Sequence, residues 1–171
     1  KYVNKILKKK MIYYWIFRIF SSCLSSIRNY KKNINILMKF DEIQIRVRYG
    51  ETDQMGVVYH GNYALYLEMG RVEWFRKLGI PYKEIEENGM ALPIVSMQLN
   101  YRKPIRYDEL INVKTQLKGK PNVKVEFEYE ITNEQGEILT TAETILVFVD
   151  IKSSRPVRAP KYILDAFGFD S

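Results

Sequence analysis

Cysteine and histidine are almost absent from this sequence of 171 residues, which contains one of each, Cys23 and His60. A single cysteine excludes a disulfide within the chain and any zinc or iron–sulfur site built on several cysteines. A single histidine excludes a metal centre with several histidine ligands, and a Ser-His-Asp arrangement could form only around His60. Metal centres built on several cysteines or several histidines are therefore not expected.

Acidic residues are absent from residues 1–37, which hold nine of the 27 lysines and arginines. Residues 38–171 contain all 20 acidic residues and the other 18 basic ones, so the formal net charge of +7 comes from the N-terminal segment. Proteins that bind a phosphate backbone carry a basic patch on the binding domain. We therefore expect no nucleic-acid binding by the globular part of the chain.

Long apolar runs are lacking as well. The longest run in the N-terminal segment covers residues 11–20 and is broken by Arg18, whereas a membrane-spanning helix needs about 20 apolar residues. We therefore expect no stable membrane span. Because Met38 directly precedes the first strand pattern, we interpret residues 1–37 as an N-terminal extension outside the fold. It would be upstream sequence read through in frame, or a targeting or membrane-surface segment.

Residues 38–171 are long enough for one domain with its own core. Alternation of apolar and polar residues predicts strands over 43–49, 92–101, 107–118, 123–131 and 138–150. Tyr49 falls on the apolar face of the first strand, and Tyr107 shares a face with the apolar residues of the third. Asn133–Gly136 is a hairpin turn signal. The run 145–149 is apolar on both faces, which predicts a strand buried on both sides.

A helix is predicted over residues 63–78, with Asn62 as its N-cap. This helix is apolar on most sides, so we expect other elements to enclose it. Gly70 lies within it and costs about 1 kcal/mol of helix propensity relative to Ala, which predicts the close approach of another element. Gly79 ends the helix, and a short second helix over 82–87 follows Pro81. One more helical turn is expected near 162–167.

The order of these elements is a strand, a long helix and then four strands joined by short connections. Short connections imply an antiparallel meander. The predicted fold class is therefore α+β, with one long helix and a curved antiparallel sheet around it.

The loop between the first strand and the long helix concentrates the residues that could carry chemistry. It places Asp53 and His60 directly before the helix, whose first N–H groups have no partner within the helix and carry the positive end of its dipole. Such a site stabilises developing negative charge. Structural interpretations remain open: Asp53 as a turn residue, His60 as a partner for a carbonyl, Tyr49 in the core, and Glu68 as the i,i+3 partner of Arg71.

Several positions in and after this loop form a joint pattern, namely Arg46-Val47, Tyr49, Thr52-Asp53, Gly56–Tyr63, Glu68, Arg71, Trp74–Arg76 and Tyr101–Asp108. The pattern resembles the 4-hydroxybenzoyl-CoA thioesterase family of hot-dog proteins, and within it the bacterial acyl-CoA thioesterases linked to the Tol–Pal operon. The resemblance covers about residues 40–155. It implies a long central helix wrapped by a five-stranded antiparallel sheet. It also implies homodimers that join their sheets, often paired into homotetramers, with active sites between subunits.

The activity implied by this resemblance is hydrolysis of an acyl-CoA thioester to a free acid and CoA in the cytoplasm. Asp53 would be the nucleophile or the general base. The backbone N–H of His60 or Gly61 would polarise the carbonyl, the His60 side chain would orient water or substrate, and Tyr49 would position the acyl group or the carboxylate. Glu68 is a second candidate for the catalytic carboxylate. No cofactor is needed, because coenzyme A is part of the substrate.

The three phosphates of CoA call for basic residues. The candidates by residue type are Arg102, Lys103, Arg106 and Lys118, and further along the chain Lys120, Arg155 and Arg158.

Other interpretations of the chain remain open. A hot-dog protein could bind acyl-CoA or an acyl carrier without hydrolysing it, although the retention of Tyr49, Asp53 and His60 favours an enzyme. A hot-dog dehydratase fits the loop poorly. A function in nucleic-acid or membrane-surface binding would act through residues 1–37, and the acyl group itself is not predicted.

Overall fold

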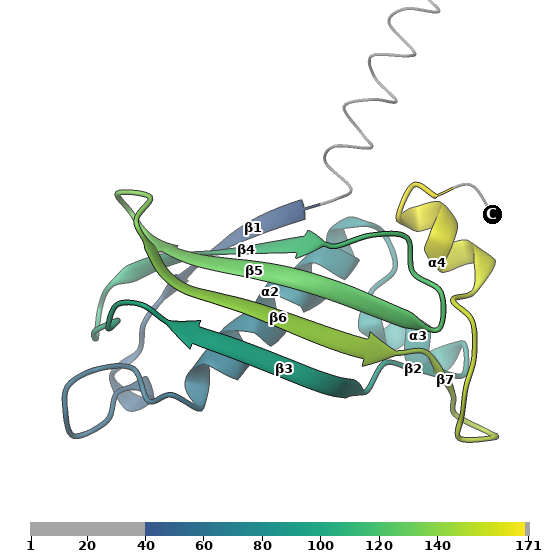
Figure 1. Cartoon of the computed structure of the whole chain (residues 1–171), viewed down its shortest axis with the longest axis horizontal. Helices are drawn as coiled ribbons and strands as arrows, with labels where there is room; N and C mark the ends of the chain where they lie inside the picture. Colours follow the sequence, from purple (N-terminus) through teal and green to yellow (C-terminus); the bar gives the residue numbers. More distant parts are fainter. Residues whose placement is uncertain (1–39, 170–171) are drawn as a thin grey trace, which may run out of the picture. The chain divides into compact units, whose positions relative to one another are not determined.

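The computed structural model describes residues 40–169, so the predictions for residues 1–37 and for Met38 lie outside the described residues. Five antiparallel strands form the main sheet in the order β1-β4-β5-β6-β3 (Figure 1). They are β1 (Phe40–Arg46), β3 (Ile94–Tyr101), β4 (Leu110–Leu117), β5 (Lys124–Asn133) and β6 (Ile138–Val147). The predicted antiparallel α+β architecture is confirmed.

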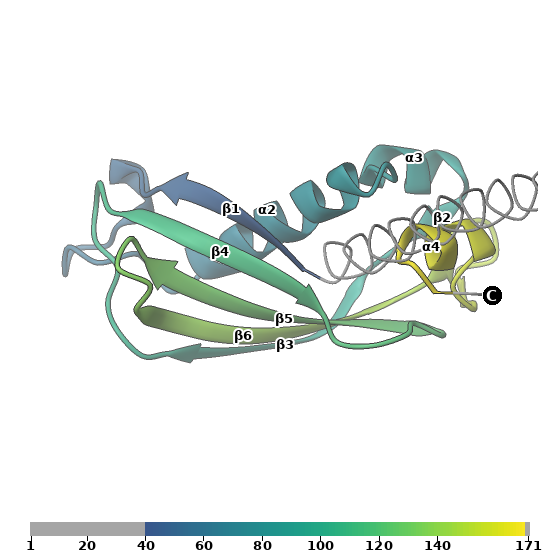
Figure 2. The same cartoon turned by 90° about the horizontal axis from the view of Figure 1, so that it is seen from above.

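The long helix α2 (Asn62–Lys77) lies along one face of this sheet (Figure 2). The short helix α3 (Tyr82–Glu87) follows it on the same side, and α4 (Lys161–Ala166) lies at one end of the sheet (Figures 1 and 2). A small second sheet joins β2 (Met90–Ala91), β7 (Val149–Asp150) and β8 (Arg155–Pro156). The helix wrapped by a sheet that the family resemblance implies is therefore present.

The core forms where the apolar faces of the strands meet α2. On β5, Val125, Phe127, Tyr129 and Ile131 are buried, while alternate residues are half-buried or exposed. On β4 the buried positions include Ile111 and Val113, as the alternation predicts. The hairpin turn at residues 133–136 is confirmed, since Gly136 has φ +78° and the Asn133 side chain accepts hydrogen bonds from the next residues.

The first strand ends earlier than predicted, and this moves Tyr49 off the sheet. β1 ends at Arg46, and Tyr49 lies in a 3-10 turn, η1 (Tyr49–Glu51), with 78% of its surface exposed. The turn forms because the Glu51 carboxylate accepts a hydrogen bond from the backbone N–H of Arg48. The assignment of Tyr49 to a buried strand face was wrong. Tyr107 is likewise exposed and precedes β4.

One prediction about α2 was also wrong. Asn62 is the first helical residue rather than the N-cap, and its side chain donates to the Glu51 carbonyl. The open interpretation of Glu68 as the i,i+3 partner of Arg71 does not hold, because Arg71 is buried and its guanidinium donates to the hydroxyls of Tyr82 and Tyr129. A guanidinium supplies five N–H donors, so two buried phenol oxygens can hold it inside the core.

The described residues leave parts of two elements uncovered. The sequence predicts that other elements enclose α2. Leu65 on this helix is nevertheless half exposed, so within the described residues the enclosure is incomplete. At the end of β6, Leu146 is buried but Ile145 and Val147 are only half-buried, so burial on both faces is not complete there. Within residues 40–169, no helix is both long and apolar enough to cross a membrane.

Candidate active site

The loop between β1 and α2 folds Asp53 into a tight turn. The Asp53 side chain accepts a hydrogen bond from the Met55 backbone N–H (2.8 Å), and its carbonyl accepts one from Gly56 (2.9 Å). Gly56 completes the turn with φ +75°, a conformation that glycine adopts without strain. The interpretation of Asp53 as a turn residue is therefore confirmed. The hydrogen bond from Met55 uses only one of the two carboxylate oxygens.

The same loop returns to the start of α2 with two unused amides. Tyr59 N–H donates to the Glu51 carbonyl and Asn62 N–H donates to the Tyr59 carbonyl, each over 2.9 Å. Between them, the backbone amides of His60 and Gly61 donate to no acceptor within residues 40–169. Unpaired N–H groups at a helix start can stabilise an anion. Gly61 lies under the Tyr59 ring, where an added Cβ would come within 2.8 Å of a ring carbon.

Asp53 and His60 border one hollow of about 290 Å³. The hollow lies between the loop and the segment that leaves the end of β3. One side is formed by the loop and the first turn of α2, with Asp53, Met55, Val57, Val58, His60 and Tyr63, and the other side by Tyr101, Arg102, Lys103 and Pro104. The half-buried Asp53 carboxylate thus shares an apolar-lined space with the histidine and with two basic residues.

Tyr101 ties the two sides of the hollow together. Its hydroxyl donates to the His60 carbonyl over 3.2 Å, and its ring packs edge-on against Tyr63 with the centroids 4.8 Å apart. Burial, and secondarily the nearby Tyr101 hydroxyl, raises the pKa of Tyr63. The sequence analysis did not select either tyrosine as a site residue, although both lie in segments that matched the family pattern.

Glu51 is a second residue that the sequence analysis missed. Its carboxylate is buried and accepts hydrogen bonds from Arg48 and from the Tyr66 hydroxyl. Burial alone raises its pKa, but these hydrogen bonds and the positive charge of Arg48 outweigh burial, so the Glu51 pKa is lowered. Burial and the bond to Glu51 raise the pKa of Tyr66. No sequence signal distinguishes a buried Glu from the many exposed ones.

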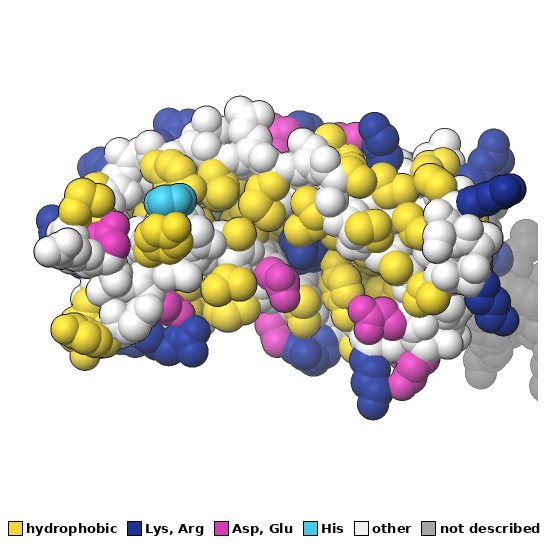
Figure 3. Space-filling model, turned by 90° about the horizontal axis from the view of Figure 1, so that it is seen from below, with side chains coloured by type: hydrophobic (Ala, Val, Ile, Leu, Met, Phe, Trp, Pro, Cys, Tyr) yellow, Lys and Arg dark blue, Asp and Glu magenta, His cyan; other side chains and the backbone are white. Residues whose placement is uncertain are grey.

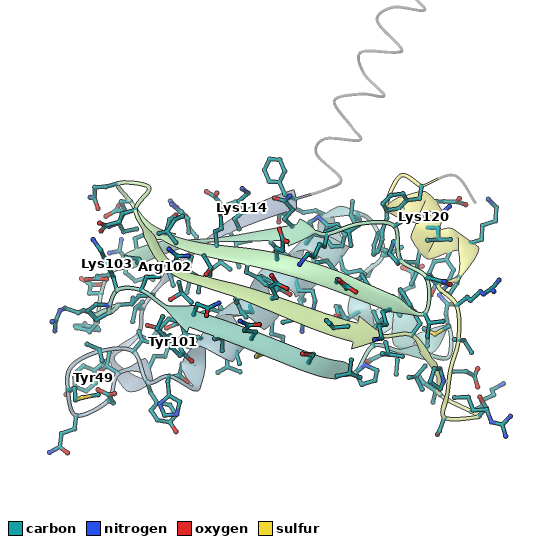
Figure 4. The ribbon with its side chains drawn as sticks, viewed as in Figure 1. Tyr49, Tyr101, Arg102, Lys103, Lys114 and Lys120 are labelled. Carbon is teal, nitrogen blue, oxygen red and sulfur yellow. The ribbon has the colours of Figure 1, made fainter. Side chains whose placement is uncertain are left out.

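The predicted basic residues divide between the two ends of the sheet. Arg102 and Lys103 line the hollow, and they lie beside Tyr101 in Figure 4. Arg106 is exposed nearby, where its backbone pairs with Val57. Lys118 follows β4 and pairs with Glu128 and Glu143 on the outer face of the sheet. The eight residues of β4, which span about 26 Å, run between Lys118 and the end of the sheet nearest the hollow, so one chain does not bring Lys118 to its own hollow.

Three further candidates lie outside the lining of the hollow. Lys120 lies at the opposite end of the sheet, beside α4 (Figure 4). Tyr49 packs edge-on against Tyr107, with ring centroids 5.5 Å apart, and does not border the hollow. Glu68 is exposed on α2 and does not border it either. Of the two predicted carboxylates, the structure brings only Asp53 to the hollow. No group of metal-binding side chains occurs among the described residues.

A model of the thioesterase-like superfamily matches residues 47–167, which include the loop, α2 and the whole meander. The Bacillus subtilis protein YneP is 36% identical over 75% of this chain and 93% of its own length. The acyl-CoA thioester hydrolase YbgC of Escherichia coli O157:H7 is 29% identical over 72% of this chain and 92% of its own length.

A solved structure shows the same arrangement of elements. The DHNA-CoA thioesterase from Staphylococcus aureus superposes with a TM-score of 0.71 and 37% sequence identity, covering 75% of this chain and 89% of the other. The similarity in sequence and in fold therefore extends over nearly all of the described residues.

Proposed function

Because this chain belongs to the thioesterase-like superfamily of hot-dog proteins, we propose that it is an acyl-CoA thioesterase that uses the hollow beside α2. The observation that carries the proposal is the placement of Asp53 and His60 around one hollow, beside the unpaired amides of His60 and Gly61 at the start of α2. The solved and curated relatives include an acyl-CoA thioester hydrolase and a DHNA-CoA thioesterase, so the reaction class is a thioester hydrolysis.

In the proposed reaction the thioester carbonyl lies between Asp53 and the start of α2. In one route Asp53 attacks the carbonyl carbon, the C–S bond breaks with CoA leaving as the thiolate, and water then hydrolyses the mixed anhydride to the free acid and Asp53. In the other route Asp53 takes a proton from a water that adds to the carbonyl, and the tetrahedral intermediate collapses by expelling the CoA thiolate. The carbonyl oxygen gains negative charge and is stabilised by the backbone N–H of His60 or Gly61 and by the positive end of the helix dipole. An ordinary Asp is a weak base at pH 7, so this activation of the carbonyl is essential.

Other residues of the hollow hold the substrate. The His60 side chain, which packs at a tilt against the Tyr59 ring with the centroids 4.2 Å apart, orients water or substrate at the exposed side. Arg102, Lys103 and Arg106 lie where the phosphates of CoA can be paired. The reaction needs no separate cofactor, since CoA belongs to the substrate.

We also propose a cytoplasmic homodimer or homotetramer. β3 is an edge strand of the main sheet, and its Ile94 and Val95 are exposed. Figure 3 views the molecule from below Figure 1, where β3 forms the lower edge of the main sheet, and shows apolar side chains along this surface. An unpaired edge with apolar residues is the place where a second sheet can add. The surface supports the assembly that the family resemblance implies, and the Tol–Pal association stays a prediction.

The test is thiol release by the full chain from a panel of short, long and aromatic acyl-CoAs. The proposal predicts turnover of at least one member, and the best substrate identifies the acyl class. Binding of acyl-CoA by calorimetry without any thiol release would contradict the proposal and would favour a non-hydrolytic binding protein.

A further inference from the structure

We infer that Glu51 is a positioning residue of the proposed thioesterase site, which it assembles by holding the Asp53 turn against the start of α2. The inference rests on the proposed function for its catalytic consequence. Glu51 lies two residues before Asp53 and does not border the hollow, so it acts through its neighbours and not on the substrate.

The Glu51 carboxylate is fixed by three donors. One oxygen accepts from the Arg48 backbone N–H and from the Tyr66 hydroxyl, each over 2.8 Å, and the other accepts from Arg48 Nε over 2.7 Å. Only 7% of the residue is exposed. Hydrogen bonds to a buried carboxylate are stronger than those between neutral groups, so the side chain anchors this turn firmly.

The Glu51 carbonyl is held by the residues that flank the two unpaired amides. It accepts from Tyr59 N–H over 2.9 Å and from Asn62 Nδ2 over 2.8 Å. Tyr59 directly precedes His60, and Asn62 directly follows Gly61. Any displacement of Glu51 therefore shifts both ends of the segment that presents these amides.

The helix contributes both of its contacts to Glu51 from one face. Asn62 and Tyr66 are four residues apart on α2, so their side chains lie one above the other. Asn62 bonds the Glu51 carbonyl and Tyr66 bonds its carboxylate. Glu51 is thus joined to α2 at two successive turns, and Asp53 is only two residues further along the chain.

This arrangement joins the turn that carries Asp53 to the segment that carries the amides of His60 and Gly61. A misplacement of about 1 Å between reacting groups costs on the order of 10²-fold in rate. Gln in place of Glu51 keeps the shape but turns one acceptor oxygen into an NH₂ donor. That donor would face the Arg48 or Tyr66 donors and push the turn away from the helix.

The experiment uses the full chain with Glu51→Gln, Tyr66→Phe and the double variant. Glu42→Gln, at an exposed position on β1, is the matched control for the change of charge. We expect Glu51→Gln to lower kcat by about 10- to 100-fold with KM changed less than about threefold. Tyr66→Phe lowers kcat less, and adding it to Glu51→Gln changes kcat by less than about twofold, because Tyr66 acts through Glu51.

Amide hydrogen exchange at Tyr59 and Asn62 provides a readout that does not depend on turnover. Both amides should exchange faster in Glu51→Gln and Tyr66→Phe than in Glu42→Gln. Unchanged exchange overturns the inference, as does a lower melting temperature with kcat per folded enzyme unaltered, which marks a merely structural role. Absence of turnover in the wild type contradicts the proposed function alone, and the exchange rates then decide whether Glu51 holds the loop.

Discussion

Gly70 on α2 lies directly against Thr115 on β4. A Cβ placed on Gly70 would come within 2.5 Å of Thr115 Oγ1 and within 3.2 Å of a methyl carbon of Val113. Real Cβ atoms do not approach so closely, so only glycine lets the helix lie this near the sheet. The close approach predicted from the position of Gly70 is thus confirmed.

Gly70→Ala should destabilise the fold although Ala is the better helix former. Overpacking a core typically costs about 1–3 kcal/mol, and the gain in helix propensity returns at most about 1 kcal/mol. We expect the free energy of unfolding, measured by urea denaturation, to fall by about 1–2 kcal/mol. Gly119→Ala is the control, because an added Cβ meets nothing within 4 Å there. A stabilised Gly70→Ala would contradict the close contact.

Arg71→Lys should also destabilise the fold. Arg71 Nε donates to Tyr82 over 2.9 Å and Nη1 to Tyr129 over 3.1 Å, in a site where Arg71 is 3% exposed. A lysine ammonium lacks the planar fork that reaches both hydroxyls. We expect a loss of about 1–3 kcal/mol in the free energy of unfolding, with little change for the exposed Arg76→Lys. Equal effects of the two substitutions would show that the buried bonds contribute nothing.

The stability of the fold should depend on Glu51 at acid pH. Its pKa in the folded chain is lowered below the ordinary value of 4.5, so the folded state favours the ionised form. Ionised Glu51 contributes stability at pH values above 4.5, and this contribution is lost as the pH falls through the folded pKa. Urea denaturation between about pH 3 and 7 should show a shallower loss of stability for Glu51→Gln than for the wild type. Glu42→Gln is the control for the change of charge. If the free energy of unfolding of Glu51→Gln falls with pH as steeply as that of the wild type, the proposed dependence on Glu51 is refuted.

The assembly should depend on the exposed edge of β3. Val95 is 56% exposed on this strand, and a charge on an edge strand opposes pairing with another sheet. We expect sedimentation to give a dimer or tetramer for the wild type and a shift toward monomer for Val95→Lys, with turnover reduced as well. Ile151→Lys, at another exposed apolar position, should leave the assembly unchanged. A monomeric wild type would contradict the proposed assembly.

The sequence predicts the elements of this fold better than their ends. Strand faces on β4 and β5 follow from alternation, and the 82–87 helix appears with the predicted bounds. Tyr49 could not be placed, because the chain bends just after β1, where the Arg48 backbone N–H donates to the Glu51 carboxylate. Tyr66 on α2 donates to the same carboxylate. A contact with a separate helix cannot be predicted from the alternation of residues within one strand.

The sequence predicts the loop side of the candidate site from spacing, whereas Arg102 and Lys103 on the other side were selected by residue type alone. Asp53 and His60 lie in one loop, so their spacing points to a common site. The opposite wall, from Tyr101 to Pro104, reaches the hollow through the pairing of β3 with β6, and strand order does not follow from a single segment. For the same reason Lys118 matched the required residue type and yet lies at the far end of β4.

The most direct test of the account compares the wild type with Asp53→Asn in thiol release from the best acyl-CoA. Binding of the same acyl-CoA, measured by calorimetry, shows whether the variant still holds its substrate. The account predicts that kcat falls at least about 100-fold while the dissociation constant changes less than about threefold. Turnover by a folded Asp53→Asn variant at the wild-type rate would contradict it and would direct attention to Glu68.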